Sequence, residues 1–144
     1  MSYLLDTNVV SEWVKPTPAA TVVAWLANVN EDEVFMSVLS FAELRRGVEL
    51  LRRGRQRARL ERWIADDLTR RFHGRVLLVD RMIAEAWGRI TARASKVGRP
   101  LGSMDAFFGA TAQAYDLTLA TRNVRGFDGL DITLFNPWDT DQSA

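Results

Sequence analysis

The feature that most constrains this 144-residue chain is the alternation of short apolar runs with longer amphipathic stretches. Short runs rich in branched apolar side chains predict strands, and apolar residues at helical spacing predict helices. A strand followed by a helix and another strand usually gives parallel pairing, because the helix returns the chain to the starting edge of the sheet. The sequence therefore predicts an α/β domain with a parallel sheet.

The expected strands cover residues 3–5, 33–37, 76–79, 118–120 and 132–135. The expected helices cover residues 9–14, 21–28, 37–53, 57–72, 81–97 and 106–115. No linker or repeat interrupts this pattern. We therefore expect one domain over residues 1–144, with a core at about 3–138 and a short frayed C-terminal tail.

Missing residue types exclude several kinds of site. The chain has no cysteine, which excludes disulfides, Cys-based zinc sites and a cysteine nucleophile. His73 is the only histidine, which argues against a multi-histidine zinc site. No run of 18 apolar residues is present, so we expect no membrane span. The absence of cysteine fits a cytoplasmic location, which we expect. Acid–base and metal chemistry therefore falls to Asp and Glu.

Positive charge gathers in one stretch, although the formal net charge is only +1. Residues 45–75 contain eleven arginines and four acidic residues. The planar guanidinium group matches pairs of phosphate oxygens. A solvated helical face and a nucleic-acid contact surface explain this stretch equally well.

Three acidic residues stand where parallel α/β sheets bind ligands, outside the carboxyl ends of the strands. Asp6 directly follows the first strand, Glu43 lies in the first turns after the second, and Asp105 stands at the entry of a helix. Converging carboxylates repel one another unless a cation lies among them. Mg²⁺ and Mn²⁺ prefer oxygen ligands, can activate a water and can neutralise charge on a phosphodiester. The pattern predicts a metal site that acts on a phosphate substrate.

Each acid also has a purely structural interpretation. Asp6 could cap the following helix. Glu43 ends the segment Ser40-Phe41-Ala42-Glu43, which has the form of a capping box. Asp105 could be a first-turn acid favoured by the helix dipole. Their joint placement nevertheless favours a shared metal.

Weaker candidates lie beside the acids or after the fourth strand, where they could orient a metal-bound water: Thr7, Asn8, Thr121 and Asn123. Arg45 and Arg46 follow Glu43 closely, and either could contact phosphate.

Ordered motifs along the chain resemble the PIN domain. They read LLDTNVVS at 4–11, SVLSFAELRRGV at 37–48, GRP at 98–100 with MDAFFGATA at 104–112, LTLATRNV at 117–124 and FNPW at 135–138. The resemblance covers about residues 3–138 and is strongest to the VapC and FitB toxins of bacterial type II toxin–antitoxin pairs.

This resemblance implies a three-layer α/β/α sandwich with a parallel five-stranded sheet. It implies RNA cleavage with Mg²⁺ or Mn²⁺ held by Asp6, Glu43 and Asp105. It further implies a homodimer silenced by a small VapB- or FitA-like antitoxin in the active-site groove, in a heterotetramer or larger assembly. Operator DNA would be bound only through the antitoxin.

One position departs from the family pattern. Many members carry a fourth acid where this chain has Asn123, whose amide brings no charge. Asp128 lies past Gly126 and Phe127, and we do not expect it to substitute. One firmly held metal is therefore expected rather than two.

Three functions follow from these features. The leading one is a toxin endoribonuclease in which activated water attacks a phosphodiester in line and leaves a 5′-phosphate. Single-stranded loops, such as those of transfer RNA, are accessible targets. The second is a non-catalytic PIN-fold regulatory module that acts with an antitoxin on promoter DNA, suggested by the missing fourth acid. The third is phosphotransfer through a nucleophilic Asp6, which Asn8 opposes because the haloacid-dehalogenase pattern has Asp there.

Overall fold

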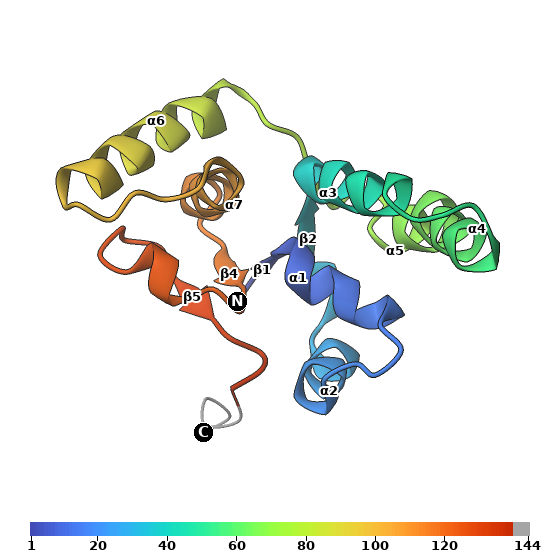
Figure 1. The fold of residues 1–144 in the computed structure, drawn as a ribbon. Coiled ribbons are helices and arrows are strands. Elements are labelled where there is room, and N and C mark those ends of the chain that lie inside the picture. The colour runs from blue at the N-terminus through green and yellow to red at the C-terminus, as the bar shows by residue number, and fades with distance from the viewer. Residues whose placement is uncertain (140–144) are drawn as a thin grey trace.

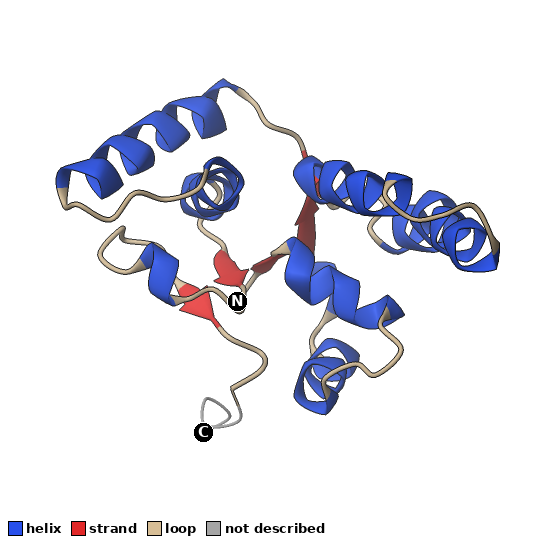
Figure 2. Cartoon of the chain, in the orientation of Figure 1, coloured by secondary structure: helices blue, strands red, loops and turns tan. Residues whose placement is uncertain are grey.

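Five short parallel strands form one sheet at the centre of the protein, as the sequence predicts (Figures 1 and 2). The computed structural model describes residues 1–139, and the predicted frayed end at 140–144 lies outside these described residues. The strands are β1 Tyr3–Leu5, β2 Val34–Ser37, β3 Val76–Leu77, β4 Thr118–Ala120 and β5 Leu134–Phe135. Their order in the sheet is β3-β2-β1-β4-β5, so the first strand of the chain lies in the middle.

Helices cover both faces of this sheet, which confirms the three-layer prediction (Figure 1). The α-helices are α1 Thr7–Val10, α2 Ala20–Asn28, α3 Val38–Glu49, α4 Arg55–Arg62, α5 Thr69–Arg71, α6 Arg81–Lys96 and α7 Ser103–Ala114. Shorter turns are the 3-10 segments η1 Ser11–Val14, η2 Glu31–Glu33 and η4 Arg125–Phe127, and the π-helix η3 Trp63–Leu68. None of the helices described is long and apolar enough to cross a membrane.

The alternation of side chains along β1 explains why two helical layers are needed. Leu5 belongs to an apolar cluster with residues of α1, α2 and η3, whereas its neighbour Leu4 belongs to a second cluster with Phe108 of α7. Both leucines are fully buried. Successive side chains of a strand point to opposite faces of the sheet. A central strand with apolar side chains on both faces must therefore be covered by helices on both sides.

The structure shortens several predicted elements. The third strand ends at Leu77, and Leu78 is 67% exposed. The predicted helix 37–53 ends at Glu49. The predicted helix 57–72 is a continuous helical path made of α4, η3 and α5, in which the Thr69 hydroxyl donates to the Ile64 carbonyl at 3.0 Å. Apolar spacing cannot reveal such a π-turn, because the same residues remain helical on both sides of it.

Helix α7 approaches the β5 region closely because Gly109 has no side chain. A Cβ atom there would lie 2.8 Å from Ile132 Cδ1 and 3.0 Å from Phe127 Cε1. The end of the Ile132 side chain can turn away, but the Phe127 ring is fully buried. We expect Gly109→Ala to lower the free energy of unfolding by about 1–3 kcal/mol through overpacking, against a helix preference for Ala of about 1 kcal/mol.

The matched control is Gly88→Ala within α6, where nothing lies within 4 Å of the added Cβ. This change should raise the free energy of unfolding by up to about 1 kcal/mol. Urea denaturation of both variants measures the contrast, and equal effects at the two positions would contradict the close approach of α7.

Candidate active site

The predicted site begins at Asp6, at the carboxyl end of the central strand. Its backbone N–H donates to the Ala120 carbonyl at 2.9 Å, so the residue continues the pairing of β1 with β4. The chain runs to β2 on one side of β1, whereas β4 on the other side comes much later in the sequence. Parallel sheets bind ligands at such a switch in strand order.

Asp6 is buried, and only 6% of its surface is exposed. The Thr121 hydroxyl, directly after β4, donates to Asp6 Oδ2 at 2.7 Å. Asp6 occupies the N-cap position of α1 but makes no side-chain cap hydrogen bond. Its carboxylate is therefore directed at Thr121 rather than used as a helix cap.

The charge of Asp6 is held at a cost in free energy. Burial raises the pKa of its carboxyl group above the ordinary value, and the hydrogen bond from Thr121 opposes that rise. The negative charges of Asp105 and Glu43 raise the pKa further. The fold thus brings the three predicted acids within electrostatic reach of one another.

Glu43 is oriented by two hydroxyl groups. Thr7 Oγ1 donates to Glu43 Oε1 at 2.6 Å and lies 2.8 Å from Ser40 Oγ. Because the Thr7 hydroxyl has one hydrogen and gives it to Glu43, Ser40 must donate to Thr7. Sequence reasoning missed this role of Ser40, although its position three residues before Glu43 puts both on one helical face.

The capping-box interpretation of Glu43 is wrong. Helix α3 begins one turn earlier than that interpretation requires, and its N-cap is Ser37, whose hydroxyl accepts from the Leu39 N–H at 3.0 Å. Ser40 is fully buried inside the helix, so it cannot act as a cap. The side chain of Glu43 is therefore available to the site.

Asp105 lies in the first turn of α7, where an acid also suits the helix dipole. Asn123 Nδ2 donates to Asp105 Oδ2 at 3.1 Å, and the Asn123 N–H donates to Thr121 Oγ1 at 3.1 Å. Thr121 and Asn123 therefore connect Asp6 to Asp105 through hydrogen bonds. An aspartate in place of Asn123 would add repulsion, whereas the amide supplies a donor.

Within residues 1–139, no three Asp, Glu or His side chains form a ready-made metal-binding cluster. Each of the three acids instead accepts a hydrogen bond from a neutral side chain. The Oδ1 atom of Asn8 is buried without a hydrogen-bond partner among the described residues.

The remaining candidates differ in how engaged they are. Arg45 lies 3.3 Å from Glu49 and 3.4 Å from Glu61. Arg46 is exposed and has no ion pair in the part of the chain that the structure describes. Asp128 pairs with Arg99 at 3.6 Å, so it is already engaged by a cation.

The match to a known family decides the identity of this fold. The family model "PIN domain" matches residues 3–132, which include every acid of the candidate site. The chain belongs to the PIN-domain family.

Relatives of this PIN domain cover nearly its whole length. "Toxin FitB" of Neisseria gonorrhoeae is 38% identical over 94% of this chain and 97% of its own. "VapC ribonuclease Y4jK" of Sinorhizobium fredii is 30% identical over 94% of this chain and 97% of its own. A solved structure of FitAB bound to an IR36 DNA fragment is 34% identical over 99% of both chains, with a TM-score of 0.92.

The raised pKa of Asp6 predicts a pH dependence of stability. The folded protein holds this proton more tightly than the unfolded chain does, so the free energy of unfolding falls as the pH rises from 3.8 through the raised pKa. Asp6→Asn removes this loss. Urea denaturation in chelator should show the variant gaining stability relative to wild type across that window, and the gain should level off above it. A relative gain by wild type would contradict the assignment.

Proposed function

We propose that this PIN domain is a metal-dependent endoribonuclease that acts as the toxin of a type II toxin–antitoxin pair. The observation that carries the proposal is the placement of Asp6, Glu43 and Asp105 near the switch in strand order, where Thr121 and Asn123 join Asp6 to Asp105 and the charges of Asp105 and Glu43 raise the pKa of Asp6. Relatives of similar length that are named ribonucleases and toxins support the RNA substrate and the toxin role.

The donor set suits Mg²⁺ or Mn²⁺. Three carboxylates supply hard oxygen ligands, and the buried, unpartnered Oδ1 of Asn8 close behind Asp6 in the chain is another oxygen of the kind such ions accept. Asp6, Glu43 and Asp105 would hold the ion. When bound, it would lower the pKa of a coordinated water and neutralise charge on the phosphodiester.

The protein's own groups would keep the ligands in place. Thr121 holds Asp6, Asn123 holds Asp105, and the Ser40–Thr7 pair holds Glu43. Hydrogen bonds of this kind fix the orientation of ligating carboxylates. Because Asn123 is neutral, the negative charge suffices for one firmly held divalent ion rather than two.

An antitoxin partner is part of the same proposal. FitB, the relative named above, is a toxin, and FitAB has been solved bound to DNA. We propose that this chain forms a homodimer that a VapB- or FitA-like antitoxin binds in a heterotetramer or larger assembly. Operator DNA would be contacted through the antitoxin, and the complex would act in the cytoplasm.

Cleavage of RNA by the purified protein, freed of its partner, tests the nuclease. Wild type with Mg²⁺ or Mn²⁺ should produce fragments with 5′-phosphates. Asp6→Asn and Asp105→Asn should lose more than about 100-fold in rate, beyond the range seen when outer partners of metal ligands are removed.

The matched control is Asp128→Asn, the same chemical change at an exposed acid that pairs with Arg99. This variant should cleave RNA at the wild-type rate. Equal cleavage by wild type, Asp6→Asn and Asp105→Asn would sink the proposal.

Metal binding has a readout independent of cleavage. A cation that binds only the folded protein stabilises it by about 2.7 kcal/mol at one hundred times its dissociation constant. Mn²⁺ should therefore raise the melting temperature of wild type and of Asp128→Asn, but not of Asp6→Asn. No response in wild type would favour the non-catalytic regulatory module over the nuclease.

A further inference from the structure

Helix α4, which contains four arginines, uses two of its faces for internal contacts. Arg57 and Glu61 face α3, where Arg57 pairs with Glu49 at 2.7 Å and Glu61 pairs with Arg45 at 3.4 Å. Leu60 packs beside a groove of about 310 Å³ that also has Glu43 in its wall. These contacts account for the attachment of the helix to the domain.

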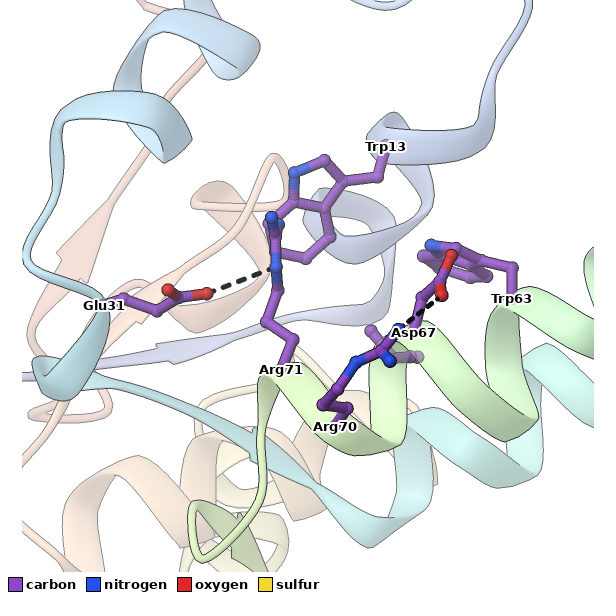
Figure 3. A pocket seen from close by; sticks show the side chains of 7 residues that line it. Trp13, Glu31, Trp63, Asp67, Arg70 and Arg71 are labelled. Carbon is purple, nitrogen blue, oxygen red and sulfur yellow. Dashed lines mark hydrogen bonds and ion pairs between the residues drawn. The ribbon is translucent and has the colours of Figure 1, made fainter.

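The third face carries an arginine row that these contacts do not explain. The row consists of Arg55, Arg59 and Arg62, at positions i, i+4 and i+7 of one helical face. All three are exposed, and none has an ion pair or hydrogen bond with another side chain among residues 1–139. By contrast, Arg70 pairs with Asp67 and Arg71 pairs with Glu31 in the neighbouring pocket (Figure 3).

Helix stability does not explain Arg55 either, whereas Arg59 and Arg62 lie in the last turn of α4, where positive charge suits the helix dipole. Arg55 is the first residue of α4, and the first turn contains no acid. The N-cap, Gly54, provides no side-chain hydrogen bond. Positive charge at a helix N-terminus is unfavourable because it faces the positive end of the helix dipole. Residues that oppose local stability often serve function.

Two adjoining grooves lie between the candidate active site and two residues of the arginine row, Arg59 and Arg62. The groove that begins at Thr7 and Glu43 extends to Leu60 and Trp63. Leu60 and Trp63 also line an adjoining groove of about 680 Å³, whose wall includes Arg59 and Arg62. A strand bound at the carboxylates can therefore leave the site along α4.

We propose that the arginine row binds successive phosphates of a single-stranded RNA that runs from the candidate active site along α4. This inference rests on the proposed nuclease function and names the surface that holds its substrate. At a rise of about 1.5 Å per residue, the three guanidinium groups extend over about 10 Å of the helix axis. Each fork can take two oxygens of a phosphate. Trp63, which packs partly against the core, lines both grooves between the carboxylates and the row.

A matched pair of triple variants tests the arginine row. Arg55, Arg59 and Arg62 are changed to Gln in one variant. In the control, Arg89, Arg93 and Lys96 are changed to Gln; these exposed residues have the same spacing on α6, at the opposite side of the molecule (Figure 1). Both variants lose three positive charges from a helix surface, and their melting temperatures confirm that they fold. Should the α4 variant fail to fold, Arg59→Gln alone replaces it.

Binding of a fluorescent single-stranded oligoribonucleotide is measured in chelator over a salt series. Loss of three phosphate contacts should reduce the slope of log affinity against log salt by about 2, at about 0.7 per contact. We expect the α4 variant to bind about 10-fold more weakly at moderate salt, and the α6 variant to match wild type. With metal present, the α4 variant should raise KM and leave kcat nearly unchanged.

Other outcomes separate the two proposals. If wild type cleaves RNA and the α4 variant binds it as wild type does, the arginine row is not the RNA surface, whereas the nuclease stands. Equal weakening by both triple variants would show a general charge effect and would also overturn the row. If wild type neither binds nor cleaves RNA, both the nuclease and the role of the arginine row are overturned. Binding of a fluorescent acidic peptide is measured in the same way. If the α4 variant loses affinity for this peptide but not for RNA, the arginine row binds a protein partner instead.

Discussion

The pairing of β1 with β4 is the constraint on which the candidate site depends. It places the end of the first strand beside the end of a strand more than a hundred residues later in the chain, and so brings Thr121 within 2.7 Å of Asp6. The central position of β1 also requires cover on both faces, which fixes where α1 and α7 lie. Asp6 follows β1 and Asp105 lies in α7, so this pairing positions two of the three acids.

The second consequence of this arrangement is that the charges of Asp105 and Glu43 repel the carboxylate of Asp6. A buried carboxylate between two other acids is unfavourable, and the fold relieves it only in part through hydroxyl and amide donors. A protein selected for stability alone would neutralise such a group. This arrangement is the physical argument for our proposal that the site receives a cation.

The arginines of residues 45–75 have different roles in the folded protein. The arginines of residues 45–75 look equivalent in the sequence. In the structure, Arg45 and Arg57 join α3 to α4, and Arg71 lies 4.5 Å from the Trp13 ring centre. Six of the eleven arginines, including the arginine row of α4, are exposed and have no ion pair among residues 1–139. The two interpretations of this stretch therefore do not exclude each other, because ion-paired and unpaired arginines are different subsets of it.

The sequence by itself determined the alternation of strands and helices, the position of Asp6 at a strand end and the resemblance around Glu43 and Asp105. These features are local, since they follow from side-chain periodicity and from which residue comes next. It could not distinguish Ser37 from Ser40 as the cap of α3, because both have the required chemistry and only backbone geometry selects between them. Nor could it reveal the path from Asp6 through Thr121 and Asn123 to Asp105. Those contacts join distant parts of the chain, and only the tertiary packing of β1, β4 and α7 decided them.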